Sequence, residues 1–200
     1  MKSIDKDAPI VVLTGAGISK ESGLDTFRDT DGIWSKVRIE DVATPDAFAQ
    51  DPDRVHAFYN ARRQGLLGEN IKPNAAHQAL ALLEREWTGE VLIVTQNIDN
   101  LHERGGAQGI IHMHGELLKS ICNGCGAITG CTSDLSISSV CRSCDAKGTL
   151  RPQVVWFGEM SLEMERIEHA LMNTVLFLSI GMSGNVYPAA DFVKGLLSYC

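Results

Sequence analysis

The sequence contains no apolar run long enough to cross a lipid bilayer, which excludes a membrane-spanning protein. Basic residues are also scarce. The 18 lysines and arginines stand against 25 acidic residues, and the net charge of −7 argues against a general binder of phosphate backbones, although it leaves room for a local basic patch. Asp5 and Asp7 occupy the region where a secretory signal would have its apolar core, so we expect a cytosolic protein.

The sequence does contain enough apolar material to build a core. Apolar residues make up 44% and charged residues 22% of the 200 positions, which excludes a wholly disordered chain and suffices for one domain, with or without a small satellite. Short apolar runs typical of buried parallel strands occupy residues 9–14, 91–95 and 175–181. Helices are predicted from Asp51 to Gly65, over 75–87 after an Asn74 cap, and over 161–172. Strands that alternate with helices predict an open α/β sheet.

Four cysteines form two close pairs in a stretch that is rich in Gly, Ser and Thr and poor in large apolar residues. Two residues separate Cys122 from Cys125 and Cys141 from Cys144, and fifteen residues lie between the pairs. This spacing is typical of a structural zinc site, in which four thiolates leave no open position for catalysis. Two disulfides or four free thiols are the alternatives, and a reducing compartment favours zinc.

We therefore predict a small zinc-binding module over residues 117–149, inserted into a domain formed by residues 1–116 and 150–200. Such a short segment cannot bury a core of its own, so it needs the metal to fold. Cys131 and Cys200 fall outside the pattern and receive no role.

A glycine-bearing turn follows the first predicted strand. Residues 14–19 read Thr-Gly-Ala-Gly-Ile-Ser, and in a Rossmann-like fold such a turn presents backbone N–H groups to a dinucleotide pyrophosphate. The strict fingerprint requires glycine at position 20, where this sequence has Lys20, so a tight turn without a ligand explains the segment equally well. Phe27 and Arg28 lie in the polar loop that follows and would cover a bound ligand; a solvated loop is the alternative.

Polar side chains also follow the second predicted strand. Residues 96–102 read Gln-Asn-Ile-Asp-Asn-Leu-His, and ligands of open α/β sheets bind at the carboxyl ends of strands. Amide and carboxylate groups there suit ribose hydroxyls and a carboxamide, although a capped helix start explains Asn97 or Asp99 almost as well. His112 and His114 end another short apolar run, where either histidine is able to act as a base near neutral pH or to satisfy a turn.

Together these segments resemble the sirtuins, a family of NAD-dependent protein lysine deacylases. The matching segments, in the family's order, are residues 15–19 with 27–28, 96–99 with His102, 114–115, the two cysteine pairs, 155–159, and Gly181 and Ser183 with Val186 and Pro188. The resemblance extends from residue 9 to residue 190. It implies a Rossmann-like parallel sheet with helices on both faces plus a small four-cysteine zinc-binding insertion.

The resemblance also implies NAD as co-substrate and one structural Zn²⁺ bound by the four paired cysteines. His114 is the implied general base and Asn97 the second catalytic residue. The reaction would release nicotinamide, deacylated lysine and O-acyl-ADP-ribose. The residues implied in NAD binding are Gly15, Ala16, Gly17, Ile18, Glu21, Thr26, Phe27, Arg28, Trp34, Gln96, Asn97, Ile98, Asp99, His114, Gly181, Met182 and Ser183.

Acylated lysine-containing proteins or peptides are the implied partners, with neither nucleic acid nor membrane. The substrate peptide would lie as an added strand against Val155, Phe157, Gly158 and Glu159. Alternatives are a protein that only binds acyl-peptide or ADP-ribose, or an enzyme that transfers ADP-ribose to protein. A nucleic-acid-binding zinc ribbon ranks last, because the cysteine-rich stretch offers only Arg142 and no aromatic residue.

Within the family, the chain is most similar to the bacterial CobB-like branch, which removes acetyl and succinyl groups. Tyr59 and Arg62 lie three apart on a predicted helix and so share a face. In this branch the corresponding pair is thought to bind the carboxylate of a succinylated lysine, a role that suits a guanidinium fork and a phenol. From the residues alone, an arginine in the last helical turn and a half-buried tyrosine are the favoured explanation.

Two features depart from the family pattern. Met182 stands where the family usually has threonine, and a thioether does not replace the hydrogen bonds of a hydroxyl. Family members also continue past Ala190 into further strands that complete the adenosine site, whereas this chain ends at Cys200. We weigh three explanations: a fragment of a longer protein, a natural truncation with weakened NAD binding, and a chain that is completed by oligomerisation.

Overall fold

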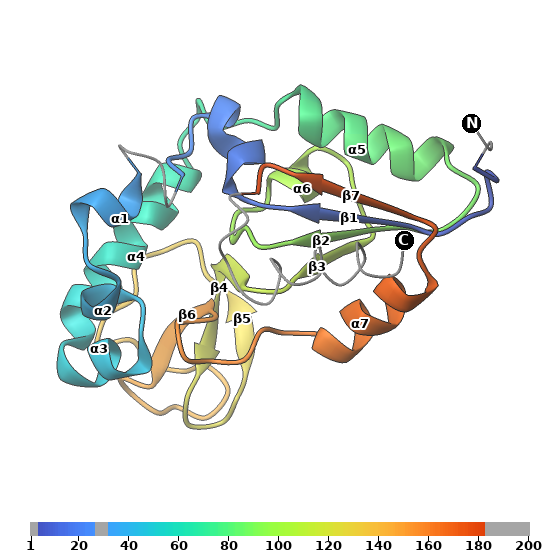
Figure 1. The fold of residues 1–200 in the computed structure, drawn as a ribbon. Helices are drawn as coiled ribbons and strands as arrows, with labels where there is room; N and C mark the ends of the chain where they lie inside the picture. The colour runs from blue at the N-terminus through green and yellow to red at the C-terminus, as the bar shows by residue number, and fades with distance from the viewer. Residues whose placement is uncertain (1–3, 27–31, 183–200) are drawn as a thin grey trace.

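A parallel sheet of four strands forms the centre of the fold in the computed structural model, which describes residues 4–26 and 32–182 (Figure 1). Its strand order is β3–β2–β1–β7. The strands are β1 (Ile10–Thr14), β2 (Val91–Thr95), β3 (Ile110–His112) and β7 (Leu176–Ile180). The three predicted strands are therefore confirmed, and β3 is the short apolar run before the histidines. All four strands run in the same direction, so their carboxyl ends share one edge.

Helices cover both faces of this sheet, as predicted. Every residue of β1 is buried, and its side chains alternate between the faces. Val11 and Leu13 pack in the cluster that contains Ile167 of α7 (Met164–Asn173), whereas Ile10 and Val12 pack with Leu80 of α5 (Ala75–Glu86). In Figure 1, α5 and α7 lie on opposite sides of the sheet.

Helix boundaries agree with the sequence where a cap marks them and differ where packing decides. Asn74 caps α5 through its side chain, in a capping box with His77. Asp51 likewise caps α4 (Pro52–Leu66), but this helix runs past the predicted end at Gly65, because Leu66 is buried in a core cluster. Helix α7 begins three residues later than predicted, since the N–H of Leu162 is bound to the carbonyl of Met113.

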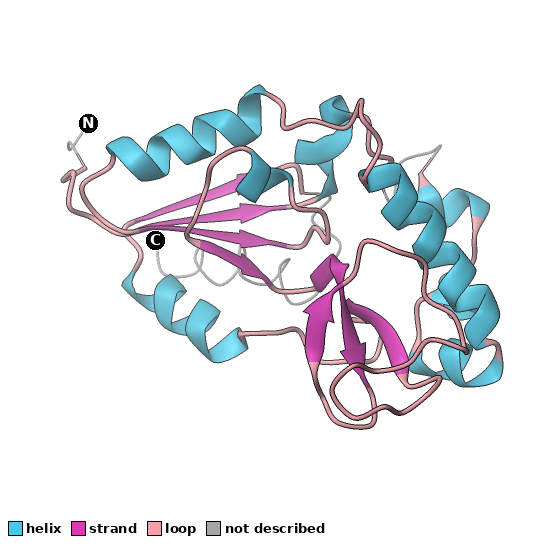
Figure 2. Ribbon diagram, turned by 180° about the vertical axis from the view of Figure 1, so that it is seen from behind, coloured by secondary structure: helices cyan, strands magenta, loops and turns pink. Residues whose placement is uncertain are grey.

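Of the remaining helices, all but α6 (Leu101–Arg104) lie beyond the carboxyl edge of the sheet, whereas α6 lies over the sheet beside α5 (Figure 1 and Figure 2). The others are the 3-10 helix η1 (Ala16–Ser22), then α1 (Ile33–Lys36), α2 (Ile39–Val42) and α3 (Pro45–Gln50). Among the described residues, no helix is both long and apolar enough to cross a membrane.

A second, antiparallel sheet has the strand order β5–β4–β6. Its strands are β4 (Gly115–Cys122), β5 (Ile128–Gly130) and β6 (Leu150–Val154), and the cysteine-rich stretch lies between β4 and β6. One core cluster joins this sheet to α4, because Leu117 and Val154 pack with Tyr59 and Trp156. The chain between His114 and Val155 thus leaves the carboxyl edge of the parallel sheet and returns to it, with the N–H of Val155 bound to the carbonyl of His114.

Candidate functional site

The glycine turn after β1 is fixed by close contact with the end of β7. The N–H of Gly15 donates to the carbonyl of Ile180, and that of Gly17 to Gly181. A Cβ atom on Gly15 would lie 2.8 Å from the Gly181 oxygen, and one on Gly17 would lie 2.8 Å from the Gly181 Cα. Gly181 itself has φ +67°, a conformation that L side chains rarely adopt. Glycine is therefore required at these three positions by backbone packing at the carboxyl edge.

The segment after β2 contacts this turn through a directed chain of hydrogen bonds. The Asn97 amide Nδ2 donates to Ser19 Oγ at 3.1 Å, and Ser19 Oγ donates to Asp99 Oδ2 at 2.9 Å. Asp99 Oδ1 also accepts the N–H of Leu101, the first residue of α6, so the side chain both contacts the start of this helix and faces the site. Burial raises the pKa of Asp99 above its ordinary value, although the hydrogen bonds from Leu101 and Ser19 oppose that shift.

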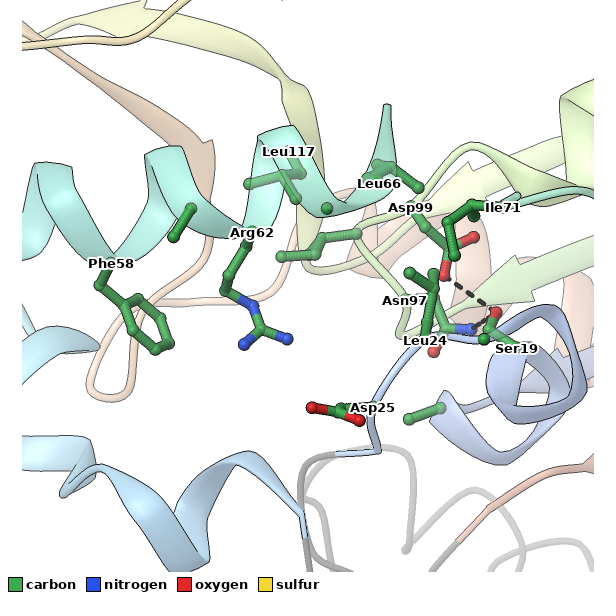
Figure 3. A pocket seen from close by; sticks show the side chains of 15 residues that line it. Ser19, Leu24, Asp25, Phe58, Arg62, Leu66, Ile71, Asn97, Asp99 and Leu117 are labelled. Atoms are coloured by element: carbon green, nitrogen blue, oxygen red, sulfur yellow. Dashed lines mark hydrogen bonds between the residues drawn. The ribbon is translucent and has the colours of Figure 1, made fainter. Parts of the chain in front are cut away.

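A cavity of about 420 Å³ brings this polar segment together with helix α4 (Figure 3). Asn97, Ile98 and Asp99 line it on one side, with Ala16 and Ser19 of η1. Figure 3 shows Arg62 pointing toward the same cavity from α4. The remaining lining residues are Gly23, Leu24, Asp25, Phe58, Ala61, Gly65, Leu66, Ile71 and Leu117.

His114 lies beside this segment, just after β3. Its ring atom Nδ1 is 3.1 Å from the carbonyl oxygen of Gln96. Since a carbonyl only accepts, Nδ1 carries the hydrogen, and the neutral ring keeps its lone pair on Nε2. Burial lowers the pKa of His114 below its ordinary value, against the opposing effect of the Gln96 carbonyl, so the ring is neutral and basic near pH 7.

The structure separates the environments of Tyr59 and Arg62. The Arg62 guanidinium lies 5.2 Å from the ring centre of Phe58, and burial lowers its pKa, opposed by the charges of Tyr59 and Asp25. Tyr59 is only 4% exposed and is not among the cavity-lining residues. Its hydroxyl accepts a hydrogen bond of 3.1 Å from the indole N–H of Trp156, and burial raises its pKa, so the phenol is neutral.

Residues 155–159 form a turn after β6 that is held from within. The Glu159 carboxylate accepts hydrogen bonds from Arg151, the shorter at 2.8 Å, and from the N–H of Trp156. Arg151 also stacks over the Trp156 ring, 4.3 Å from its centre. Phe157 is 43% exposed and Gly158 has φ +94°. This arrangement leaves part of the turn accessible beside the second sheet.

The four predicted zinc ligands converge. Their sulfur atoms all lie within 4.8 Å of one another, and the Sγ atoms of Cys122 and Cys144, like those of Cys125 and Cys141, are 3.8 Å apart. A tetrahedral Zn²⁺ with bonds of about 2.3 Å requires sulfur atoms about 3.8 Å apart. Both separations are far longer than the ~2.05 Å of a disulfide bond. The four sulfur atoms are therefore spaced as a zinc site requires, and the Cys122–Cys144 and Cys125–Cys141 pairs are not disulfide-bonded.

Two equivalent turns create this geometry. The N–H of Gly126 is bound to the carbonyl of Cys122, and that of Asp145 to the carbonyl of Cys141. Gly126 and Asp145 both have positive φ, at +73° and +57°. Each pair of thiols is thus folded over the same side of its turn. Cys131 lies buried outside the set, with its sulfur bound to the carbonyl of Ser133.

The other residues predicted to bind NAD have varied surroundings. Ile18 and Thr26 are buried, and Glu21 is exposed on η1. The Gln96 amide donates to the sulfur of Met182 at 2.6 Å, so the methionine that replaces the usual threonine contacts the site. Trp34 belongs to α1, and its side chain is outside the description; Phe27, Arg28 and Ser183 lie outside the described residues altogether.

Ser19 and Asn60 hold the site together without having been predicted to do so. Ser19 bridges Asn97 and Asp99, and its place at the end of the glycine turn is the only sequence signal for this role. Asn60 Oδ1 accepts from Arg63 and from the N–H of Leu135, which anchors α4 to the cysteine-rich stretch. No local pattern indicates that contact, because 75 residues separate its partners.

The sequence is similar to those of known proteins over most of its length. The sequence model of the Sir2 family matches residues 15–188. A curated protein named NAD-dependent protein deacylase, from Vibrio parahaemolyticus serotype O3:K6 (strain RIMD 2210633), is 59% identical over 184 residues, which cover 92% of this chain and 76% of the relative.

Solved structures give the same result. A Sir2 homologue mutant in complex with ADP-ribose has a TM-score of 0.87 and 38% identity, with 96% of this chain and 78% of that chain covered. A structure described as Sir2 with a p53 peptide and NAD⁺ has a TM-score of 0.77 and 31% identity, with 94% and 77% covered. The Rossmann-like parallel sheet is therefore the fold of this chain.

Proposed function

The chain belongs to the Sir2 family, and from that membership we propose that it is an NAD-dependent protein deacylase, which removes acyl groups from lysine side chains. One observation carries the proposal to these particular residues. The cavity at the carboxyl edge of the sheet is lined by Asn97 and Asp99, and His114 lies beside the same segment, with its Nε2 hydrogen-bonded to none of the described residues. The products would be nicotinamide, deacylated lysine and O-acyl-ADP-ribose.

The described residues fit a nicotinamide nucleotide. Asp99 is 8% exposed, and no basic side chain among the described residues forms an ion pair with it. Its carboxylate accepts only two hydrogen bonds from the described chain, which leaves acceptor capacity for the N–H groups of a carboxamide. When bound, NAD supplies the ribose carbon to which the acyl oxygen becomes bonded. It also supplies nicotinamide as the leaving group.

Side chains of this site would divide the work between holding and proton transfer. Asp99 and the Ile98 backbone would hold the carboxamide, and Gln96 and Asn97 would face the ribose. Ser19 keeps both Asn97 and Asp99 in place through its hydroxyl. The interlocked glycines would let the backbone of Ala16 approach the diphosphate.

His114 would act as the general base on the ribose hydroxyls. Its Nδ1–H is engaged with the Gln96 carbonyl, so Nε2 is the atom that accepts the proton. The lowered pKa keeps this nitrogen unprotonated at neutral pH. His114→Ala should abolish deacylation while leaving the unfolding midpoint close to that of the unchanged chain. Full activity in this variant would remove His114 from the role.

Arg62 would select acyl groups that end in a carboxylate. Its guanidinium points toward the cavity (Figure 3), beside the Phe58 ring. A guanidinium holds a carboxylate through two charge-assisted hydrogen bonds, a contact that an acetyl group does not make. Tyr59 does not line the cavity, so its neutral, buried hydroxyl would support the part of α4 that presents Arg62.

Arg62→Met should therefore depress desuccinylation far more than deacetylation, by about 10-fold or more in the ratio of kcat/KM values. The acetylated form of the same peptide is the internal control for folding and for NAD binding. Equal losses on both peptides would contradict the acyl-carboxylate role.

Acylated lysine peptides are the proposed partners. The exposed part of the turn at Val155–Glu159 lies beside β6, where an extended peptide would add main-chain hydrogen bonds and be recognised largely through its backbone. The rigid pairing of Glu159 with Arg151 keeps this turn in shape. Zinc would stay structural, because four thiolates leave it no open position.

The test is a mass-spectrometric assay of acetyl- and succinyl-lysine peptides with and without NAD. The proposal expects NAD-dependent loss of the acyl group and a new acyl-ADP-ribose. Acyl-peptide binding without nicotinamide release would favour a binding protein instead. Label transferred from NAD to protein would favour an ADP-ribosyltransferase.

A further inference from the structure

His112 lies two residues before His114, at the end of β3, and contacts the segment 96–99 at the next carbonyl group along the chain. Its Nδ1 is 3.3 Å from the carbonyl oxygen of Asn97, and its Nε2 is 2.5 Å from a carboxylate oxygen of Glu103 on α6. The side chain of His112 is only 9% exposed.

The two partners of His112 determine its protonation state. A backbone carbonyl and an ionised carboxylate only accept hydrogen bonds, so both ring nitrogens must donate. Only the imidazolium form carries a hydrogen on each nitrogen. A neutral ring would place a lone pair against either Asn97 or Glu103 and would lose one of the two contacts.

We propose that His112, held as an imidazolium by Glu103, is a positioning residue that fixes the carbonyl of Asn97 and so orders the segment 96–99 for deacylation. This inference rests on the function proposed above for that segment. His112 does not line the cavity and would act through its contact with the carbonyl of Asn97.

The neighbouring carbonyls show why this contact matters. Three consecutive carbonyl groups, those of residues 96, 97 and 98, each accept one hydrogen bond, from His114, His112 and the N–H of Leu117 respectively. The Leu117 donor does not titrate, and His114 donates from its neutral form. Only the cation keeps the middle contact together with the contact to Glu103, because a neutral ring has one hydrogen and the shorter, charge-assisted contact to Glu103 takes it.

Charges from several elements surround the His112 ring. Burial by itself would lower the pKa of His112, but the hydrogen bond and charge of Glu103, followed by the charge of Glu116 on β4, outweigh it and raise the pKa above its ordinary value. Glu116 is itself paired with Lys119 at 2.5 Å. Asp99 and His102 are the other titratable groups in electrostatic contact with the ring.

The two histidines at the end of β3 therefore shift in opposite directions. The pKa of His114 is lowered and that of His112 is raised, so between the two values one ring is a free base and the other a fixed cation. Deacylation should be greatest in this window. Its acid limb would report His114, and its alkaline limb would report His112.

The first experiment measures protonation in the absence of NAD. Histidine ring signals are followed by heteronuclear NMR from pH 5.5 to 9.5, and the His112 signal is assigned by its loss in His112→Gln. We expect a midpoint above the ordinary value of about 6.5. Glu103→Gln, which keeps the shape and removes the charge, should lower that midpoint by about one unit or more. Glu86→Gln, which removes an exposed acid on α5, is the matched control and should leave it unchanged.

The second experiment measures kcat and the KM for NAD over the same pH range. The alkaline limb should appear in the KM for NAD, which rises about fivefold on loss of one hydrogen bond, while kcat changes less. Glu103→Gln should move this limb to lower pH by the same interval as the NMR midpoint. In His112→Gln the KM should be raised at every pH and the limb should disappear.

Two results would overturn the proposal: a His112 midpoint at or below the ordinary value, or a Glu103→Gln variant in which the NMR midpoint and the KM limb both stay in place. A chain that deacylates no peptide at any pH would contradict the proposed function instead. In that case the backbone amide shifts of residues 96–99 in His112→Gln still decide whether His112 orders the segment.

Discussion

Mild acid should destabilise this protein through two histidines buried between α5 and α6. His77 and His102 are 0% and 1% exposed, with ring centres 5.0 Å apart. His77 Nε2 and His102 Nδ1 have no hydrogen-bond partner among the described residues. Burial lowers the pKa of each ring from 6.5 to about 4, and the charge of His77 adds to the effect on His102.

The sign of the effect follows from where each state binds protons. Above pH 6.5 both rings are neutral in the folded and the unfolded chain, so they contribute no pH dependence. Between pH 6.5 and 4 the unfolded chain takes up protons that the folded chain does not, so stability falls as the pH falls. At pH 5.5 the loss is about 1.4 kcal/mol for each histidine, or about 2.8 kcal/mol for both. That is a large share of a typical folding free energy of about 5–15 kcal/mol.

Urea unfolding at pH 7.5 and 5.5 measures this loss. His77→Gln removes one of the two titrating rings and should reduce the loss by about 1.4 kcal/mol relative to the unchanged chain. His169→Gln, which removes an exposed ring on α7, is the matched control and should behave like the unchanged chain. The pKa values of His56, His112 and His114 are also shifted, but these residues and the zinc site are common to all three proteins. Equal losses in the unchanged chain and in His77→Gln would refute the reasoning.

Three further predictions concern the zinc site, the glycine turn and the core. Cys141→Ser should lower the bound zinc, measured by elemental analysis, from one ion per chain to none. Cys131→Ser, the control, should keep the zinc. Zinc retained in Cys141→Ser would refute the four-thiolate site. Gly17→Ala places a Cβ 2.8 Å from the Gly181 Cα and should lower the free energy of unfolding in urea by about 1–3 kcal/mol. In the control, Gly130→Ala, the new Cβ meets nothing within 4 Å and the loss should be small. Similar unfolding midpoints for the two variants would contradict the close contact between the turn and Gly181. Tyr59→Phe leaves the Trp156 indole N–H without its acceptor and should cost about 1–3 kcal/mol, and an unchanged midpoint would show that this buried hydrogen bond contributes nothing.

Local patterns in the sequence were sufficient where the structure depends on neighbours in the chain. The strand at Val91–Thr95 was predicted with its observed bounds, because five consecutive apolar or β-branched residues are buried on both faces. Asn74 caps α5 as expected, since capping needs only the following turn. The cysteine pairs are equally local, because each pair sits on one tight turn.

Other features depend on packing between residues far apart in the sequence, which local patterns do not predict. The end of α4 at Leu66 depends on a core that includes Leu117 and Val154, which no local signal at Gly65 indicates. The bond from Trp156 to Tyr59 joins residues 97 apart and gives the Tyr59 hydroxyl a partner that helix spacing does not predict. The contact of His112 with Glu103 likewise needs the end of β3 to lie against α6.

The functional roles came chiefly from the family resemblance. Spacing alone left the glycine turn and the segment 96–99 open to purely structural explanations, and both explanations hold in part. Gly15 and Gly17 are required by contact with Gly181, and Asp99 accepts the first N–H of α6, although Asn100 is the N-cap residue. The same residues therefore stabilise the fold and also lie in or next to the cavity.

The central claim is that this chain couples NAD cleavage to removal of an acyl group from lysine. Its most direct test is the stoichiometry of nicotinamide released to lysine deacylated, measured with acetyl- and succinyl-lysine peptides on the 200-residue chain. The account predicts one nicotinamide for each lysine freed, with neither product formed when NAD or the acyl-peptide is omitted. Deacylation without NAD, or nicotinamide release without deacylation, would contradict it.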